Sequence, residues 1–372
     1  MPTKLFDGKK IIEEKKQLLL AYGRRALIVT GSQSSKINGS LGDVEDALKA
    51  LNIDYRIFDQ VEENPSIENV IEGAKAYKEA EFVIGIGGGS PLDAAKAIAV
   101  LLKNPHEPEE KILFETPNAK ALPVIAVPTT AGTGSEVTPY SILTVHKDQT
   151  KRNFKCRVFP EIAFLDVSYF LTMSIHVRVH TCIDALTHLV ESYLNTNATE
   201  YSDGIVEAGL TLWAKGFPRI QAENIDETHM QYFIAASTFA GMAISQTGTS
   251  LPHGMGYFLT YHHGLSHGHA NGILTSSYLR LYQDQDKVNR LLRCLGFHSI
   301  VAFEKEVDVL LPALNLREDQ MLMHAEQMML NQAKLKNYPF EVTKDELFMM
   351  YKGKSSQAVS YTHLTLPTKR IV

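Results

Sequence analysis

The chain has 372 residues, of which 44% are hydrophobic and 21% are charged, and its formal net charge is −5 at pH 7. Values so close to the average of soluble globular proteins exclude a largely disordered chain and a membrane-embedded one, and the negative charge leaves no basic surface for nucleic acid. The length favours two domains, because single hydrophobic cores stop growing at roughly 250–300 residues.

Cysteine content and the N-terminus bear on where the protein works. Cys156, Cys182 and Cys294 are too few and too scattered for a disulfide framework or a CxxC metal site, which fits a reducing compartment. No N-terminal apolar run is long enough for a signal peptide, and no later stretch approaches the ~18 apolar residues of a membrane span. We therefore expect a cytoplasmic protein that has neither a nucleic-acid nor a membrane partner.

The first half of the chain alternates strand-like runs with helical patterns. Strands are expected at residues 25–30, 55–58, 82–86 and 123–127, and helices at residues 43–51, 67–78 and 93–102. Continuous apolar strands that alternate with helices are typical of a mostly parallel sheet covered on both faces. The pattern predicts an α/β nucleotide-binding domain over residues 1–170.

Beyond about residue 170 the apolar periodicity is helical nearly throughout. Clear helical stretches are residues 184–194, 202–216, 230–244 and 318–333. The change predicts an all-α metal-binding domain over residues 171–356. Residues 357–372 are rich in threonine and β-branched residues and do not continue the pattern, so we interpret them as an extraneous or disordered tail.

A glycine-rich loop follows the expected strand at residues 82–86. The loop and the helix that it opens provide Gly87, Gly88, Gly89, Ser90 and Asp93. Glycines let backbone N–H groups approach a pyrophosphate closely, and a helix N-terminus favours negative charge. Such a turn alone is a weak signal, because many tight turns have the same composition.

A second loop of small residues, 128–136, follows the next strand and carries Thr129, Thr130 and Thr133. Its hydroxyl groups offer hydrogen-bond donors with little steric bulk. A solvated loop would look similar. Two such loops at the carboxyl ends of strands nevertheless favour a nucleotide site, because ligands of open α/β sheets bind there.

The loop after the first strand contains Gly31, Ser32, Ser34 and Lys36 but no acidic residue. An acid at this place commonly binds the ribose 2′-hydroxyl of NAD and repels a 2′-phosphate. Small hydroxyl residues and a lysine could instead accept that phosphate. The loop therefore favours NADP(H) over NAD(H), and an ordinary turn is the alternative.

Asp184 and His188 stand four residues apart in a helical pattern, so both side chains share one face. Together with His253 and His267 they form a carboxylate and imidazole set that suits Fe²⁺ or Zn²⁺. Each residue alone is unremarkable, but five of the 14 histidines fall within residues 253–269. The surplus histidines, His262, His263 and His269, compete for the ligand roles, and spacing does not choose among them.

Four segments together resemble the iron-containing, or group III, alcohol dehydrogenase family. They are GGGSPLDAAKA, PTTAGTGSEVT, DALTHLVE and the stretch from PHGMGY to SHGHANGIL, and the resemblance covers roughly residues 20–350. It implies a Rossmann-like N-terminal domain, an all-α C-terminal domain as in dehydroquinate synthase-like proteins, and an active site in the cleft between them.

The resemblance also implies roles for individual residues. The metal ligands fall on Asp184, His188, His253 and His267. The pyrophosphate loop falls on residues 87–90 with Asp93, and the threonine loop on Thr129, Thr130 and Thr133. Asn64 and Lys151 fall on positions that resemble cofactor contacts.

The sequence departs from the family pattern at three places, which bear on cofactor preference, proton transfer and the substrate pocket. Gly31 stands where many members carry an acid, which supports NADP. Tyr257 replaces a histidine that some members place near the nicotinamide, so the proton relay is open among His263, His269, Tyr257 and a bound water. Bulkier residues precede Asp184, and His180 becomes a candidate for the substrate pocket.

The expected function is a metal-dependent alcohol dehydrogenase or aldehyde reductase, transferring a hydride between NADP(H) or NAD(H) and a small alcohol or aldehyde. Fe²⁺ is the preferred metal, Zn²⁺ the alternative, and a homodimer or higher homo-oligomer the expected assembly. The expected catalytic residues are His253, His267, His263 and Tyr257.

Other functions remain open at this point. An enzyme of the same fold acting on polyols or phosphorylated substrates, like glycerol dehydrogenase or dehydroquinate synthase, would need Lys and Arg along the cleft. Arg178 is the one such residue near the ligand segments. A non-catalytic nucleotide- or metal-binding protein and a metal-dependent hydrolase are the remaining alternatives.

Overall fold

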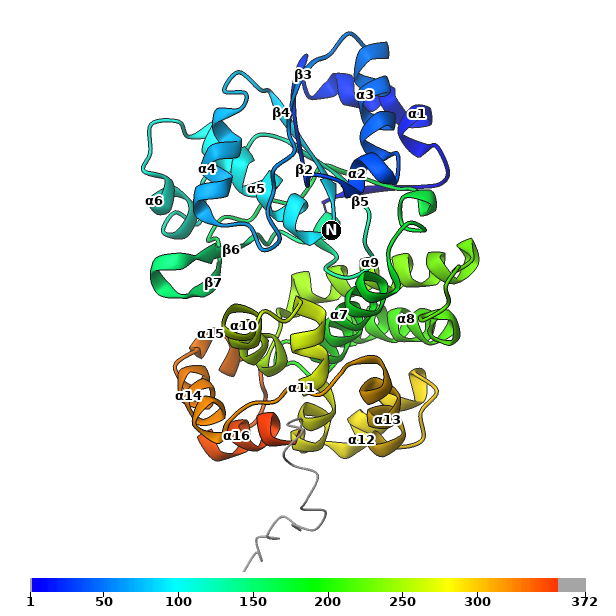
Figure 1. The fold of residues 1–372 in the computed structure, drawn as a ribbon, viewed down its shortest axis with the longest axis vertical. Coiled ribbons are helices and arrows are strands. Elements are labelled where there is room, and N and C mark those ends of the chain that lie inside the picture. Colours follow the sequence, from blue (N-terminus) through cyan, green and yellow to red (C-terminus); the bar gives the residue numbers. More distant parts are fainter. Residues whose placement is uncertain (1, 354–372) are drawn as a thin grey trace, which may run out of the picture.

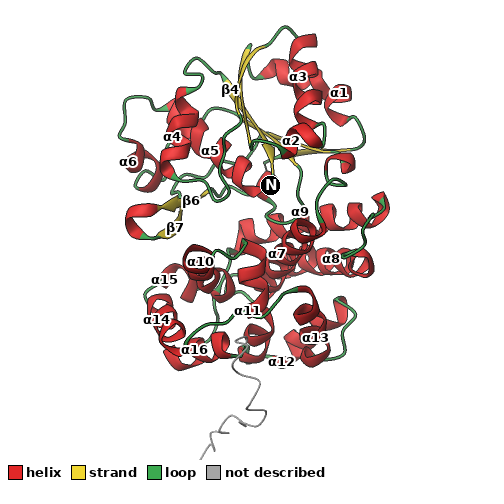
Figure 2. Ribbon diagram, viewed as in Figure 1, coloured by secondary structure: helices red, strands yellow, loops and turns green. Residues whose placement is uncertain are grey.

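The computed structural model describes residues 2–353, and within them the large sheet lies in the first half of the chain (Figures 1 and 2). Six parallel strands follow the order β1-β8-β5-β4-β2-β3. Their bounds are β1 Lys4–Asp7, β2 Arg25–Thr30, β3 Asp54–Phe58, β4 Phe82–Gly87, β5 Val124–Pro128 and β8 Ile162–Leu165. The four expected strands are confirmed to within one residue, whereas β1 and β8 are additional.

Helices cover both faces of this sheet, as its continuous apolar strands predict. One side of β2, with Leu27 and Val29, packs with the helices α4, α5 and α6. The other side, with Ala26 and Ile28, packs with α1 and α3. The bounds are α1 Ile11–Lys15, α2 Ser34–Ile37, α3 Ser40–Ala50, α4 Ile67–Lys75, α5 Gly89–Lys103 and α6 Glu109–Phe114. Helix α5 begins four residues earlier than expected, because the glycine loop itself forms its first turn.

A two-stranded antiparallel hairpin, β6 (Ile142–Val145) and β7 (Thr150–Asn153), lies apart from the large sheet. The sequence pattern did not predict it, since each strand is only four residues long. Strand β7 contacts helix α10, so the hairpin reaches from the sheet toward the helical part of the chain (Figure 1).

The second half is helical, as expected, and most of its long helix α7 is buried. The bounds are α7 Ile175–Tyr193, α8 Glu200–Gly216, α9 Glu227–Thr247, α10 Leu251–His263, α11 His267–Leu281, α12 Gln285–Cys294, α13 Ile300–Leu310, α14 Glu318–Met329, α15 Gln332–Leu335 and α16 Lys344–Lys352. Helix α7 packs against α8, α9, α10 and α11. Among the described helices, none combines the length and apolarity needed to cross a bilayer.

The expected helix at 318–333 is interrupted. Asn331 has φ −85° and ψ 71°, which are not helical angles, and it separates α14 from α15. The α/β and all-α fold class is confirmed. The domain division near residue 170 stays a prediction, which the passage from β8 to α7 supports. The tail at 357–372 lies outside the described residues.

Candidate active site

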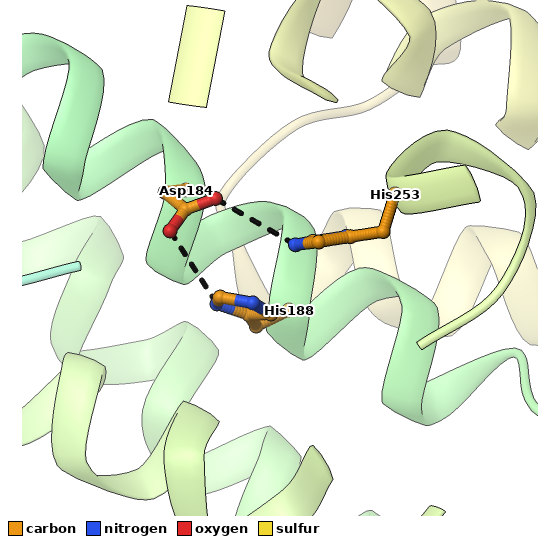
Figure 3. A group of neighbouring side chains, drawn as sticks. All are labelled: Asp184, His188 and His253. Carbon is orange, nitrogen blue, oxygen red and sulfur yellow. Dashed lines mark ion pairs between the residues drawn. The ribbon is translucent and has the colours of Figure 1, made fainter. Parts of the chain in front are cut away.

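Four predicted ligands come from three helices. Asp184 and His188 lie on α7, His253 lies in the first turn of α10, and His267 is the first residue of α11. Figure 3 shows the Asp184 carboxylate directed at both His188 and His253. Asp184 Oδ1 lies 3.6 Å from His253 Nε2 and 3.8 Å from His267 Nε2, and Oδ2 lies 3.9 Å from His188 Nδ1. These separations suit donor atoms that each lie about 2.1 Å from one shared ion.

The burial of these groups tests whether a cation fits. The side chains of Asp184, His188 and His253 are almost fully buried, and their ligand atoms lie within 4.8 Å of one another. Within residues 2–353, His188 Nδ1 and His253 Nε2 have no hydrogen-bond partner. A buried polar atom without a partner is destabilising, and a metal ion between these atoms would satisfy both nitrogens. The donor set therefore fits a divalent cation.

Protonation favours the same conclusion. Burial lowers the pKa of His188 to about 4 and lowers the pKa of His267 well below its usual value. Burial opposes ionisation of Asp184, but the neighbouring His188, His267 and His253 hold the pKa of its carboxyl below the usual range. A metal ion needs neutral imidazoles and an ionised carboxylate. At neutral pH the chain presents His188, His267 and Asp184 in those forms.

Glu191 is a residue of this site that the sequence analysis missed. It is completely buried, and its carboxylate accepts hydrogen bonds from the Ser250 amide and from His253 Nδ1. Burial opposes a charge on His253, but Glu191 and Asp184 together raise the pKa of His253. With its proton on Nδ1 and bonded to Glu191, His253 turns the free lone pair of Nε2 toward Asp184. Histidines that bind metals are commonly held by a carboxylate in this way. The signal was present, because Glu191 follows Asp184 by two helical turns.

Replacing Glu191 with glutamine should weaken metal binding by roughly tenfold to a hundredfold, because an amide holds the His253 proton less well. The measurement is the dissociation constant of the metal in a chelator competition, with thermal unfolding of the metal-free protein run in parallel. Glu207→Gln is the control. Glu207 lies on α8 and accepts a hydrogen bond from the Tyr193 hydroxyl, so this variant makes the same chemical change at another hydrogen-bonded carboxylate. Equal metal affinities in the two variants would mean that Glu191 does not position His253.

Glycines bring the third histidine to the site. A Cβ on Gly268 would lie 1.8 Å from the backbone oxygen of His180, and a Cβ on Gly272 would lie 2.4 Å from Ile183 Cγ2. Only glycine permits so close an approach of α11 to α7. Because Gly268 follows His267 directly, this packing determines where the imidazole lies relative to Asp184.

The two predicted nucleotide loops pack on each other. The Thr129 amide donates to the Gly87 oxygen over 2.9 Å. A Cβ on Gly88 would lie 2.9 Å from Thr130 Oγ1, and a Cβ on Gly89 would lie 2.6 Å from Thr133 Cγ2. Gly87 also has φ +142°, a backbone conformation that favours glycine. The glycine and threonine loops therefore form one surface at the carboxyl ends of β4 and β5.

This surface lies next to the metal ligands. A Cβ on Gly132 would lie 2.8 Å from both the Cβ and the backbone oxygen of Thr181, so the threonine loop packs directly on α7. Asp184 and His188 follow Thr181 on the same helix. The predicted cofactor loops thus pack on the helix that carries two of the predicted metal ligands.

Asp93 braces the loops. Its Oδ1 accepts from Ser135 Oγ over 2.6 Å, and its Oδ2 accepts from the Ile142 amide over 2.8 Å. The fully buried Lys96 donates to Ser135 Oγ and to the Tyr140 carbonyl. Both oxygens of Asp93 are thus used within the chain, which ties α5 to the threonine loop and to the hairpin.

Asn64 and Lys151, far apart in sequence, meet at the glycine loop. Lys151 Nζ donates to Asn64 Oδ1 over 2.7 Å, and the backbone N–H of Asn64 donates to Ser90 Oγ over 3.1 Å. Asn64 has φ +59°, which asparagine tolerates better than most residues. Burial lowers the pKa of Lys151 to about 8. The hairpin therefore delivers a cation to the predicted cofactor site.

The loop after β2 is open to solvent. Ser32 and Ser34 are exposed, and Gly31 is partly exposed. Lys36 forms an ion pair with Asp59, 2.6 Å from Nζ to Oδ2. To bind a phosphate, Lys36 would have to leave Asp59. That exchange costs little, because an exposed ion pair contributes little energy.

The surplus histidines do not join the ligands. His263 ends α10, and its Nε2 lies 3.1 Å from His324 Nε2. His269 Nε2 donates to the Pro312 carbonyl, and His262 is exposed and stacks on His324. None of these contacts is with Asp184, His188, His253 or His267, and the catalytic role of His263 stays a prediction.

Packing also places three further residues that the sequence analysis named. Tyr257 does reach the site, because its ring stacks on His267 with 5.9 Å between centroids. His180 lies one turn before Asp184 and shares a 2.6 Å hydrogen bond with Ser266 Oγ. Arg178 is fully buried and donates to the carbonyls of Ile220 and Ala222, so it does not line a substrate site.

Known proteins are similar to this chain in sequence and in fold. The profile of iron-containing alcohol dehydrogenase matches residues 2–167, and that of the Fe-containing alcohol dehydrogenase family, C-terminal, matches residues 178–354. The chain is 30% identical over 280 residues to NADPH-dependent butanol dehydrogenase of Clostridium saccharobutylicum, which covers 73% of this chain and 71% of the relative. It is 31% identical over 282 residues to lactaldehyde reductase of Escherichia coli (strain K12), which covers 73% and 72%. An iron-containing alcohol dehydrogenase from Thermotoga maritima matches its fold with TM-score 0.89 and 38% identity, over 95% of this chain and 98% of that one.

Proposed function

This chain belongs to the iron-containing alcohol dehydrogenase family, and from that premise we propose that Asp184, His188, His253 and His267 hold its metal ion beside the nicotinamide. The protein is an NAD(P)-dependent oxidoreductase that interconverts alcohols and aldehydes. The observation that carries the site proposal is the pair of buried, unpartnered nitrogens on His188 and His253, which face one ionised carboxylate.

Each part of the site has a task in this reaction. When bound, the metal supplies a Lewis acid for the substrate oxygen. Asp184 supplies the negative charge that holds the cation, and Glu191 orients His253. Hydride exchange requires the substrate carbon to be held against the nicotinamide, and we assign that positioning to the glycine and threonine loops.

The cofactor contacts that we propose are those of the sequence analysis. Residues 87–90 would hold the pyrophosphate, because backbone amides and the N-terminus of α5 favour an anion there. Thr129, Thr130 and Thr133 line the adjoining loop, and Lys151 with Asn64 flanks Ser90. Tyr257 is the proposed proton carrier, since it lies against His267; burial raises its pKa, so the phenol stays protonated at neutral pH.

We propose a small alcohol or aldehyde as substrate, with Fe²⁺ as the preferred metal and Zn²⁺ as the alternative. The butanol and lactaldehyde activities in the names of two relatives support this size class. The test is elemental analysis of the purified protein followed by a panel of short alcohols and aldehydes with both cofactors. A metal-loaded protein that changes cofactor absorbance with none of them would contradict the proposal.

We also propose a preference for NADP(H), because Gly31 stands where an acid would repel the 2′-phosphate. Gly31→Asp should shift the ratio of kcat/KM toward NAD(H) by roughly tenfold or more, because juxtaposed like charges are costly. The substitution fits the space, since a Cβ there would lie 3.8 Å from the Val61 oxygen. Gly42→Asp on α3, where a Cβ meets nothing within 4 Å, is the charge-matched control. An unchanged ratio in Gly31→Asp would refute this assignment.

A homodimer or higher homo-oligomer and a cytoplasmic location stay predictions. Light scattering of the purified protein and fractionation of its source cells would check them.

A further inference from the structure

The four predicted metal ligands differ in exposure. The side chains of Asp184, His188 and His253 are 3%, 6% and 3% exposed, whereas that of His267 is 26% exposed. The ring of Tyr257, which stacks on His267, is also partly exposed. A substrate would reach the predicted cation most readily from this more exposed side, past His267 and Tyr257, so side chains next to Tyr257 would influence which substrates fit.

The side chain next to Tyr257 on this approach is Lys334 of α15. Its Nζ lies 5.5 Å from the centre of the Tyr257 ring and donates a hydrogen bond to Thr249 Oγ1. A Cβ on Gly254 would lie 3.1 Å from Lys334 Cγ. The aliphatic part of the lysine side chain therefore packs against α10 at this glycine. No local sequence pattern links Lys334 to this site, because it follows Asp184 by 150 positions.

Lys334 has no counter-ion of its own. Within residues 2–353 no carboxylate lies within ion-pair distance of it, and the nearest acid to influence it, Glu191, is already bonded to His253 and Ser250. A half-buried ammonium without a carboxylate partner is costly to keep, which is typical of a binding group. Burial lowers the pKa of Lys334 to about 8, with Glu191 partly offsetting the effect, so the ammonium form still dominates at pH 7.

We propose that Lys334 binds an anionic group on the substrate, so that this enzyme prefers short aldehydes and alcohols that carry a carboxylate, sulfonate or phosphate. The inference rests on the proposed function, since it places the anion in the same cleft. In the row His267, Tyr257, Lys334, the first two rings lie 5.9 Å apart between centroids, and Lys334 Nζ lies 5.5 Å from the centre of the Tyr257 ring. A substrate of a few carbon atoms, with its oxygen at the metal, can reach across that row.

The test compares substrates of equal length with the metal-loaded enzyme. The kcat/KM for reduction of 4-oxobutanoate should exceed that of pentanal by roughly tenfold to a hundredfold, the range of a hydrogen bond to a charged group. 3-Oxopropane-1-sulfonate serves as the second anion and shows whether a carboxylate is required. Lys334→Met should remove the preference by raising KM for the anions, and Lys334→Arg should keep most of it.

Controls separate this inference from a structural role and from the proposed function. Lys336→Met removes an exposed lysine two residues away and should keep the wild-type preference. The binding of succinate, measured by calorimetry on the NADP complex, should weaken in Lys334→Met but not in Lys336→Met. Turnover of pentanal without any preference for the anions would overturn the inference and leave the proposed function standing. No turnover of any of the three aldehydes would count against the proposed function itself.

Discussion

Replacing Asp184 with alanine is expected to abolish metal binding and to lower kcat/KM for alcohol oxidation by on the order of a thousandfold. The Asp184 carboxylate faces all three predicted histidine ligands, at 3.6–3.9 Å. A Lewis acid contributes several kcal/mol to such a reaction, and each 1.36 kcal/mol corresponds to a factor of ten. Metal content is measured by elemental analysis and activity by cofactor absorbance. His267→Ala should give the same loss.

The affinity for the cofactor distinguishes loss of the metal in Asp184→Ala from a general loss of structure. The loops at 87–90 and 128–136 lie on the sheet domain, so the dissociation constant of NADP should change little in Asp184→Ala. His262→Ala is the matched control, because His262 belongs to the same histidine-rich segment but is exposed and stacks on His324. If Asp184→Ala keeps its metal and its activity after chelation and reloading, the four ligands are assigned wrongly.

Replacing Gly268 with alanine is expected to destabilise the protein by about 3 kcal/mol or more and to lose the metal as well. The added Cβ would lie 1.8 Å from the backbone oxygen of His180 and 3.1 Å from Asp184 Cβ. Backbone atoms of a buried helix cannot rotate away as a flexible side chain can, so α11 must move off α7. That movement carries His267 away from Asp184. Urea unfolding and metal titration measure the two effects.

Gly204→Ala on α8 provides a control of opposite sign. A Cβ there would meet nothing within 4 Å, and the residue lies inside a helix. Alanine should therefore be neutral or stabilise the protein by about 0.5–1 kcal/mol, because glycine loses more backbone freedom in a helix. Equal stabilities of Gly268→Ala and Gly204→Ala would mean that the α7–α11 contact is looser than the structure has it.

Local sequence determined much of this protein. The strands β2, β4 and β5 follow from short apolar runs that end at glycine, proline or polar residues, and the predicted nucleotide loops follow from their glycines and threonines. Asp184 and His188 could be paired because a helix places positions four apart on one face. These features depend on residues within a few positions of one another, which is why they can be read directly.

Tertiary packing decided the rest. The sequence could not separate His253 and His267 from His262 and His263 without the resemblance, because all four lie within 15 positions. The contact of Gly268 with His180 and the turn that ends α10 decide which of these rings face Asp184. Lys334 is a similar case. It lies on α15, and the break at Asn331 between α14 and α15 lets its side chain lie next to Tyr257. Contacts between residues tens of positions apart depend on how whole helices dock, and that docking is the sum of many small packing energies that no short segment contains.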